Sequence, residues 1–355
     1  MSERGWLVRH VRLERVGCRA ALRSRAFTVR LAAVSFAVLM TAGLARADQV
    51  FVTYSTSDPG NHLVEEYISS GITGVNTDAG IFTTDADTPS GIALDSSGDL
   101  YLADFNTGTV TEFSPSGANL GVVASGLTQP TGLAFDSFGN LYIASNDNNG
   151  TVTEVPAGGG TPTAIATGLS DPTGLAVLSG TLYVSSYVNS EIDEVPLGGS
   201  GLRSFTPFVT HDGGFDDLNK PVGLAFDASG NLYVANSGIN SIEQFTPDGT
   251  GSVFASNPDT TDNPSGLNDP MGLAFDSSGD LFVANYHHDG PEHTGTSTIE
   301  EFSSSGNLLD TFDVPDLRDA DFIAIEVPEP AIAGFLALGA ATFFGVSRLR
   351  RLRGA

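Results

Sequence analysis

Cysteine, tryptophan and, over most of its length, positive charge are scarce in this sequence. The single cysteine, Cys18, and the single tryptophan, Trp6, both lie near the N-terminus. A chain segment without cysteine forms no disulfide, has no thiol chemistry and offers no metal–thiolate site. We therefore expect the rest of the protein to be stabilised by packing and by hydrogen bonds within sheets.

Positive charge is concentrated at the two ends of the chain. Of 16 Lys and Arg residues, nine lie in residues 1–47 and four in residues 348–353. Only Arg203, Lys220 and Arg318 remain between them. Residues 48–330 carry 40 acidic against three basic side chains, a net formal charge of −37. Such a body repels nucleic acid and anionic membrane surfaces, and it attracts divalent cations.

The first 47 residues are typical of an export signal. An Arg-rich stretch precedes an apolar run from Leu31 to Leu44, and Ala45 and Ala47 supply the small residues of a cleavage site. The apolar run is shorter than the roughly 20 residues of a membrane-spanning helix. We expect a helical signal segment, 1–47, that is cleaved after Ala47; the alternative is an uncleaved anchor.

The last 29 residues, 327–355, are typical of a second sorting signal. Val327-Pro328-Glu329-Pro330 is followed by a mostly apolar run from Ala331 to Val346 and then by four arginines. Each arginine costs about 3 kcal/mol in the hydrocarbon core on insertion scales, so the cluster should stay cytoplasmic. The body, 48–326, would then lie on the far side of the inner membrane.

This tail resembles the PEP-CTERM sorting signal of Gram-negative, biofilm-forming bacteria. The resemblance implies a helical sorting segment and an exosortase-type protease that removes it near Pro-Glu-Pro. It also implies delivery to the cell surface or the extracellular polymer, after transient attachment to the membrane. An ordinary C-terminal membrane anchor is the alternative. In both cases the membrane is contacted only through the terminal segments, and residues 48–326 hold the function.

One strand pattern occurs five times in that body. Its glycines, Gly91, Gly132, Gly174, Gly223 and Gly272, are 41, 42, 49 and 49 residues apart, which favours four-stranded propeller blades over helical repeats. Each copy predicts two strands joined by a turn, Asp-x-x-Gly in four of the five, whose aspartate can accept hydrogen bonds from amides two or three residues on. The third copy lacks one residue and has Leu178 in place of the aspartate, so we expect a tighter turn there. The copies are PSGIALDSSGDLYLAD (89–104), PTGLAFDSFGNLYIAS (130–145), PTGLAVLSGTLYVSS (172–186), PVGLAFDASGNLYVAN (221–236) and PMGLAFDSSGDLFVAN (270–285).

The two ends of the body complete a further blade. Residues 49–55, 62–69 and 80–84 are typical of second, third and fourth strands, and residues 319–326 of a first strand. Joining them removes the exposed edges of an open array. We predict an all-β, six-bladed propeller in which one C-terminal strand lies beside three N-terminal strands.

The signature P-x-G-L-A-x-D-x-x-G-x-L-Y-V-A resembles the NHL-repeat proteins and, more distantly, the gluconolactonase and regucalcin-type propellers. The resemblance covers roughly residues 50–326. It implies the fold more than an activity, because such propellers include lactonases, lyases, scaffold proteins and ligand sensors. Function must therefore be argued from a site.

Three long polar loops, 210–220, 257–269 and 286–296, should lie on one face. They contain imidazole and carboxylate groups that suit a transition metal, and carboxylates that suit Ca²⁺. A solvated acidic loop is the alternative. The candidate metal ligands here are His287, His288, Asp289 and His293, and the candidate ligand-binding residues are His211, Asp212, Tyr187 and Tyr286.

A second candidate metal site lies where the second strands end. Most residues at these strand ends are polar, and we expect them to surround the mouth of the central channel. In gluconolactonase-like proteins a divalent ion is held near this region, and the resemblance carries over only to Asp104, Asn236 and Asn285. That family's N-terminal Glu-Gly-Pro motif has no counterpart here. A water-filled polar channel is the alternative.

The sequence favours an exported, non-enzymatic binding or scaffold module whose partner is a matrix polysaccharide or a surface protein. A divalent cation such as Ca²⁺ is the one cofactor for which it offers ligands. The rival interpretation is a metal-dependent lactonase- or lyase-like hydrolase on the same propeller. Neither a phosphate-binding loop nor a G-x-S-x-G nucleophile elbow occurs.

Overall fold

Strands and turns make up almost all of the described part of the computed structural model, in which one short 3-10 helix, η1 (Ser237–Ile239), also occurs. The structure describes residues 48–54, 63–69, 77–83, 87–147, 149–210, 218–256, 266–286, 297–313 and 320–326, all within one unit, Arg46–Pro330. The expected helical signals, 1–47 and 327–355, lie outside these residues. Among the described residues no helix is both long and apolar enough to cross a bilayer.

Five antiparallel sheets each contain four strands that follow one another in the chain, and each begins with one of the five repeats. Sheet 1 contains β4 (Pro89–Leu94), β5 (Leu100–Asp104), β6 (Thr109–Phe113) and β7 (Asn119–Ser125); sheet 2 contains β8 (Pro130–Phe135), β9 (Leu141–Ser145), β10 (Thr151–Val155) and β11 (Thr163–Thr167); sheet 3 contains β12 (Pro172–Leu178), β13 (Thr181–Ser186), β14 (Glu191–Pro196) and β15 (Thr206–Thr210); sheet 4 contains β16 (Pro221–Phe226), β17 (Leu232–Asn236), β18 (Ser241–Phe245) and β19 (Gly251–Ser256); sheet 5 contains β20 (Pro270–Phe275), β21 (Leu281–Asn285), β22 (Thr298–Phe302) and β23 (Leu308–Asp313).

A sixth four-stranded sheet, here called the composite sheet, is built from both ends of the body. Its order is β24 (Ala320–Glu326), β1 (Asp48–Tyr54), β2 (Leu63–Ser69), β3 (Thr77–Thr83). In the β1–β24 register Phe51 is opposite Ala324. The predicted pairing of one C-terminal strand with three N-terminal strands is therefore present, and the all-β propeller prediction is confirmed.

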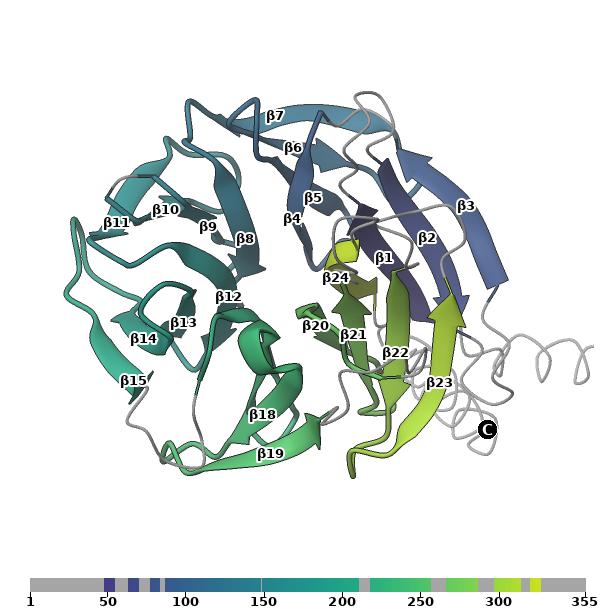
Figure 1. Cartoon of the computed structure of the whole chain (residues 1–355). Helices are drawn as coiled ribbons and strands as arrows, with labels where there is room; N and C mark the ends of the chain where they lie inside the picture. Colours follow the sequence, from purple (N-terminus) through teal and green to yellow (C-terminus); the bar gives the residue numbers. More distant parts are fainter. Residues whose placement is uncertain are drawn as a thin grey trace, which may run out of the picture. The chain divides into compact units, whose positions relative to one another are not determined.

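The first strand of each sheet lies innermost, and β24 takes this place in the composite sheet (Figure 1). These strands are neighbours in the order β4, β8, β12, β16, β20, β24 and back to β4. The repeated glycines explain how they approach so closely. A Cβ atom at Gly132 would lie 2.1 Å from the Thr173 carbonyl oxygen, and one at Gly174 would lie 2.0 Å from that of Val222. A side chain at these positions would force the inner strands apart.

The turns between first and second strands follow the predicted chemistry, with one correction. In sheet 2, Asp136 Oδ1 accepts hydrogen bonds from the amides of Phe138 and Asn140, both at 2.9 Å. The acceptor therefore bonds amides two and four residues on, whereas we expected two or three. In sheet 3 the missing residue leaves a two-residue turn, Ser179 and Gly180, with φ of 49° and 82°. The expectation of a tighter turn there is confirmed.

Apolar side chains fill the spaces between neighbouring sheets, and this explains why the strands are apolar at consecutive positions. All five residues of β9 are buried. Between sheets 3 and 4, the Tyr183 ring meets Phe208 and Phe226 edge to face, with centroids 5.2 and 5.0 Å away. Both faces of sheet 3 thus contact a neighbouring sheet.

Candidate functional site

The predicted loop residues cannot be placed. His211, Asp212, His287, His288, Asp289 and His293 lie outside the described residues. The described part of the chain contains no histidine and no group of three or more His, Cys, Asp and Glu side chains placed to hold a metal ion. A metal site in these loops therefore stays a prediction.

The three strand-end candidates, Asp104, Asn236 and Asn285, are buried, with 7%, 0% and 0% of their surface exposed. Each accepts a hydrogen bond from the link that leads into its own sheet. Asp87 N donates to Asp104 Oδ2 at 2.7 Å, Asn219 N to Asn236 Oδ1 at 2.6 Å, and Asn268 N to Asn285 Oδ1 at 3.2 Å.

Whether these three side chains also surround the mouth of the central channel stays a prediction. They turn towards the backbone of the links, because buried amides require acceptors. This bond holds the link against the end of the second strand. Whether the same oxygens also hold a cation stays a prediction.

Tyr187 and Tyr286 directly follow the second strands of sheets 3 and 5, so sheet 4 separates them in the ring. Their amides donate to the carbonyl oxygens of Asp171 and Asp269, both at 3.1 Å. The Lys220 ammonium lies 5.6 Å from the centroid of the Tyr187 ring. The structure therefore does not bring the two tyrosines into one site, and the Tyr187 ring already has a cationic neighbour.

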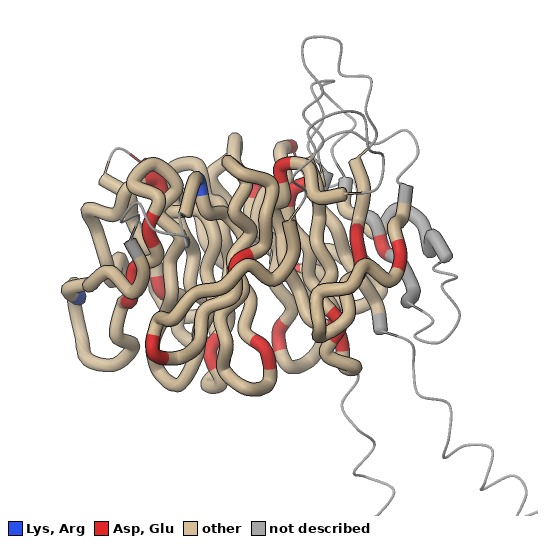
Figure 2. Tube along the Cα trace, turned by 60° about the horizontal axis from the view of Figure 1, so that its bottom comes forward, with Lys and Arg blue, Asp and Glu red and all other residues tan. Residues whose placement is uncertain are grey.

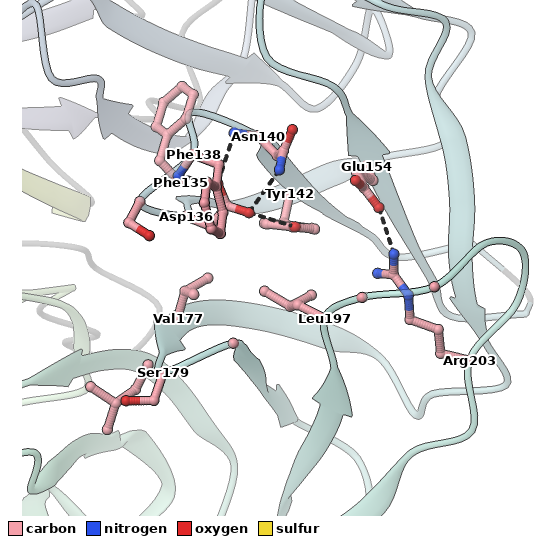
Figure 3. Close-up of a pocket in the computed structure, with 15 residues that line it drawn as sticks. Phe135, Asp136, Phe138, Asn140, Tyr142, Glu154, Val177, Ser179, Leu197 and Arg203 are labelled. Atoms are coloured by element: carbon pink, nitrogen blue, oxygen red, sulfur yellow. Dashed lines mark hydrogen bonds and ion pairs between the residues drawn. The ribbon is translucent and has the colours of Figure 1, made fainter.

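A cleft opens between sheets 2 and 3, beside the turns that join their first and second strands (Figure 3). Its volume is about 340 Å³. Sheet 2 supplies the turn from Phe135 to Asn140, with Tyr142 on β9 and Glu154 on β10. Sheet 3 supplies the turn from Val177 to Gly180 and the segment from Leu197 to Arg203.

Two departures from the repeat line this cleft. The β12–β13 turn is one residue short, so less chain covers sheet 2 at this point. The β14–β15 loop, 197–205, has nine residues, whereas loops 114–118, 246–250 and 303–307 have five. Gly198, Gly199 and Gly201 in the long loop adopt positive φ, which residues with a Cβ rarely do. The loop therefore reaches towards sheet 2.

Arg203 is the residue that the long loop carries into the cleft. Its amide donates to the Ile165 carbonyl oxygen on β11 at 2.6 Å, and its Nη2 forms an ion pair with Glu154 Oε2 at 2.8 Å. Its side chain is only 10% exposed. The Nε and Nη1 donors are buried and have no hydrogen-bond partner among the described residues. Unpartnered buried donors are costly, so these two groups require an acceptor.

Hydrogen bonds fix the polar groups at the other end of the cleft. Asp136 Oδ2 accepts from Asn140 Nδ2 at 2.8 Å and from the Tyr142 hydroxyl at 3.0 Å (Figure 3). Burial by itself raises the pKa of Asp136, but the bonds from Asn140, Tyr142 and the Phe138 amide outweigh it and hold the pKa below its usual range. The pKa of Tyr142 is raised, mainly because the residue is buried and secondly because its hydroxyl donates to Asp136. Asp136 is thus ionised and Tyr142 neutral at physiological pH.

An exposed aromatic ring lies beside these fixed polar groups. Phe138 is 82% exposed, the most exposed of the large apolar side chains in the described chain. The corresponding residues of the other turns are Ser97, Ser229 and Ser278. Large exposed apolar side chains next to a cleft are typical of binding surfaces.

The cleft has the chemistry of a binding site. The donors on Arg203 and the ring of Phe138 can position a ligand. Figure 2 shows acidic residues spread over the described chain, in which Arg203 and Lys220 are the basic side chains. An anion at Arg203 would therefore also meet Glu154 and the acidic body, and like charges 4 Å apart repel by about 1–4 kcal/mol.

Sequence reasoning missed this site, although two signals pointed to it. The third repeat is the one with a deletion, and Arg203 is one of three basic residues in the body. Only the fold brings the deletion and the arginine together across the gap between sheets 2 and 3.

Comparison with known proteins supports the fold. Residues 54–147 match the family model described as "SMP-30/Gluconolactonase/LRE-like region". No curated protein matches the chain. A chain in the crystal structure of a nidogen/laminin complex superposes with a TM-score of 0.63 and 18% identity, over 78% of this chain and 98% of that one.

Two bacterial structures are also similar. A protein of unknown function from Bacteroides caccae has a TM-score of 0.57 and 15% identity, over 80% of this chain and 100% of that one. A protein of unknown function from Bacteroides thetaiotaomicron VPI-5482 has a TM-score of 0.53 and 14% identity, over 78% of this chain and 84% of that one. The chain thus shares the β-propeller fold of these structures, and over residues 54–147 it is similar to the gluconolactonase-like family.

Proposed function

We propose that the protein is an exported propeller of six blades, five continuous and one closed by both ends of the body, that acts as a non-enzymatic binding or scaffold module. The cleft between sheets 2 and 3 is its docking site. The observation that carries this proposal is the pair of unpartnered donors on Arg203, which lie buried in a cleft with an exposed aromatic ring. Such a site has the few convergent polar groups and the apolar wall of a ligand pocket.

Export is part of the same proposal. Residues 1–47 act as the signal peptide, and residues 327–355 as the PEP-CTERM segment that an exosortase-type protease removes. The partner is then a matrix polysaccharide or a surface protein outside the cell. The intact mass of the protein from its native cells tests both cleavages: we expect a chain that starts at Asp48 and ends near Pro328. An unprocessed mass would contradict this part.

Binding is tested with the processed protein on an array of neutral, acidic and basic glycans. We expect retention of a subset of glycans, and weaker retention by Phe138→Ala. Phe138 is 82% exposed, so its loss should leave the fold intact. Leu120→Ala, on β7 and 54% exposed, is the matched control and should bind like the wild type. If Phe138→Ala and Leu120→Ala retain the glycans equally well, the cleft is not the docking site.

The second candidate function is a metal-dependent lactonase- or lyase-like hydrolase. The match of residues 54–147 to the gluconolactonase-like family favours it, because this stretch includes Asp104. Elemental analysis separates the two functions. One divalent ion per chain that is lost on His287→Ala with His288→Ala, together with lactone hydrolysis, would support the enzyme and contradict the scaffold. A dialysed protein without metal or turnover would support binding.

A further inference from the structure

We infer that Asn149 is a modification site, whose side-chain nitrogen receives a glycan from a lipid-pyrophosphate-linked oligosaccharide. The residue begins the triplet Asn149-Gly150-Thr151, which has the N-x-[ST] pattern of an N-glycosylation acceptor. Among all asparagines of the sequence, only Asn149 and Asn263 have Ser or Thr two residues on, and Pro264 excludes Asn263. The inference rests on the export part of the proposed function, because such acceptors belong to secreted chains.

The fold places this triplet at the surface. Asn149 lies in the segment 146–150, between β9 and β10, and it is exposed, whereas Gly150 is buried. The segment has five residues, and the corresponding segments of sheets 1, 3 and 4, which are 105–108, 187–190 and 237–240, have four. Within the described chain the Asn149 side chain makes no hydrogen bond, so its amide nitrogen is available.

The backbone at this point is fixed against the link between sheets 2 and 3. Gly168 N donates to the Asn149 carbonyl oxygen at 2.5 Å, and Leu169 N donates to that of Gly150 at 3.2 Å. A Cβ atom at Gly150 would lie 1.9 Å from the Leu169 carbonyl oxygen, so only glycine allows this approach. A glycan on the exposed side chain of Asn149 can therefore extend into solvent without displacing either sheet.

Hydrogen bonds also determine when the transfer takes place. In the folded protein Thr151 Oγ1 donates to Asp147 Oδ2 at 2.9 Å, and the Asn149 amide donates to Asp147 Oδ1 at 3.0 Å. An enzyme that binds the threonine hydroxyl and the asparagine together must break these bonds and those to the link. The acceptor is therefore accessible before sheet 3 packs against sheet 2, while the chain is being exported.

The transfer is a substitution at C1 of the first sugar. A bond forms between C1 and Asn149 Nδ2, and the bond between C1 and the pyrophosphate oxygen breaks. The lipid pyrophosphate leaves with the electron pair of that bond, and a base of the transferring enzyme accepts the proton that the amide nitrogen loses. The reaction requires no oxidant or reductant.

Deamidation is the competing reaction at an Asn-Gly pair. It requires the Gly150 nitrogen to attack the side-chain carbon of Asn149. In the folded protein the Gly150 amide donates to the Asp147 carbonyl oxygen at 3.0 Å, and the Gly150 carbonyl oxygen is held by Leu169. The nitrogen is thus fixed in the turn, and the side-chain amide of Asn149 is preserved.

Strand β9 separates Asn149 from the cleft between sheets 2 and 3. The cleft lies beside the turn that precedes Leu141, whereas Asn149 follows the other end of the strand, Ser145. Five residues of extended strand are about 16 Å long. A glycan on Asn149 therefore leaves the cleft accessible, and the modification can be tested separately from binding.

Mass spectrometry of the full protein from its native cells tests the inference. Proteolysis after glutamate releases residues 113–154 as one peptide, which contains Asn149. We expect this peptide to carry the mass of a glycan, and electron-transfer fragmentation to place the glycan on Asn149. An unmodified peptide, a deamidated peptide without sugar, or a glycan on a serine or threonine would overturn the assignment.

Variants expressed in the same cells separate the acceptor sequence from its surroundings. Asn149→Gln and Thr151→Val should remove the glycan completely, whereas Thr151→Ser keeps the hydroxyl and should keep the glycan. Asn106→Gln, at an exposed position of the corresponding segment of sheet 1, is the matched control and should leave the glycan mass unchanged. Because the Asn149 side chain is exposed, Asn149→Gln should fold normally, and a glycan that persists in this variant would refute the site.

The outcomes also distinguish this inference from the proposed function. A chain that has lost both terminal segments and has an unmodified Asn149 would overturn the glycosylation and keep the export. A chain that is neither processed nor glycosylated would overturn both. Asn149→Gln should bind the glycan array as the wild type does. Loss of binding in Asn149→Gln, with the glycan present in the wild type, would support the modification and contradict the cleft as the docking site.

Discussion

Thr53 Oγ1, on β1, accepts a hydrogen bond from the backbone amide of Phe322, on β24, at 3.0 Å across 269 residues of sequence. The same hydroxyl donates to the carbonyl oxygen of Ser90, on β4, at 3.0 Å. Thr53 lies where the β1–β24 register is interrupted, between Val52 and Tyr54. One side chain therefore supplies the bond that the interrupted ladder lacks and connects the composite sheet to sheet 1.

Replacing this hydroxyl by a methyl group should weaken the closure of the ring. Thr53→Val keeps the side-chain volume but leaves the Phe322 amide and the Ser90 carbonyl without this partner. We expect the free energy of unfolding to fall by about 1–3 kcal/mol, the cost of unsatisfied buried groups. Chemical denaturation measures the loss. Thr163→Val, at an exposed position of β11, is the control and should change stability by less than about 0.5 kcal/mol.

The glycine of the second repeat should tolerate no side chain. In Gly132→Ala the new Cβ would lie 2.1 Å from the Thr173 carbonyl oxygen, so β8 and β12 would have to separate. We expect a loss of about 1–3 kcal/mol or more. In Gly160→Ala the nearest atom is the Pro156 side chain, at 2.9 Å in an exposed turn that can adjust. Equal melting temperatures for the two variants would show that the inner strands are not held this closely.

A buried carboxylate should make stability depend on pH. Glu300 on β22 is fully buried, and burial raises its pKa to about 7, although Asn285 and the Gly266 amide oppose this. The folded protein therefore holds a proton that the unfolded chain releases near pH 4.5, so this group's contribution to stability is greatest at low pH and declines as the pH rises towards 7.

The variant Glu300→Gln isolates this effect. Glutamine mimics the protonated acid and does not titrate, so the variant should match the wild type near pH 4 and exceed its stability by about 3 kcal/mol near pH 7.5. Urea denaturation at both pH values measures the difference. A stability difference that is the same at both pH values would contradict the raised pKa.

The buried asparagine of sheet 4 should act through the backbone of its link. Asn236→Ala leaves the Asn219 amide without its acceptor at 2.6 Å, and we expect a loss of about 1–3 kcal/mol in the free energy of unfolding. Asn236→Asp supplies the same acceptor oxygen and should recover part of the loss. If elemental analysis instead found a divalent ion that Asn236→Ala releases, the residue would be a metal ligand as well.

Several features of the fold were predictable because they depend on local pattern. The shared glycines, the turns after the first strands and the apolar strands predicted the first two strands of sheets 1 to 5 and the tighter turn at Ser179. The missing first strand before residue 89 and the isolated strand at 319–326 implied the composite sheet. Edge strands require partners, and only the two ends of the body were left unpaired.

The site was less predictable, because exposure and contact are properties of the assembled fold. Polarity placed Asp104, Asn236 and Asn285 correctly at strand ends, but it could not show that each turns inward to a backbone amide. Sequence also showed that Arg203 is a rare cation and that the third repeat lacks a residue, without showing that they face one cleft.

By itself the sequence determined the repeat, the strands and the distribution of charge, because each depends on neighbouring residues and on composition; the two terminal signals stay predictions. The tertiary structure decided which polar groups have partners and which do not. Arg203 lies 49 residues from Glu154 in the chain and meets it only because sheet 3 packs against sheet 2. Its two unpartnered donors exist only in that packed arrangement, and no local pattern encodes them.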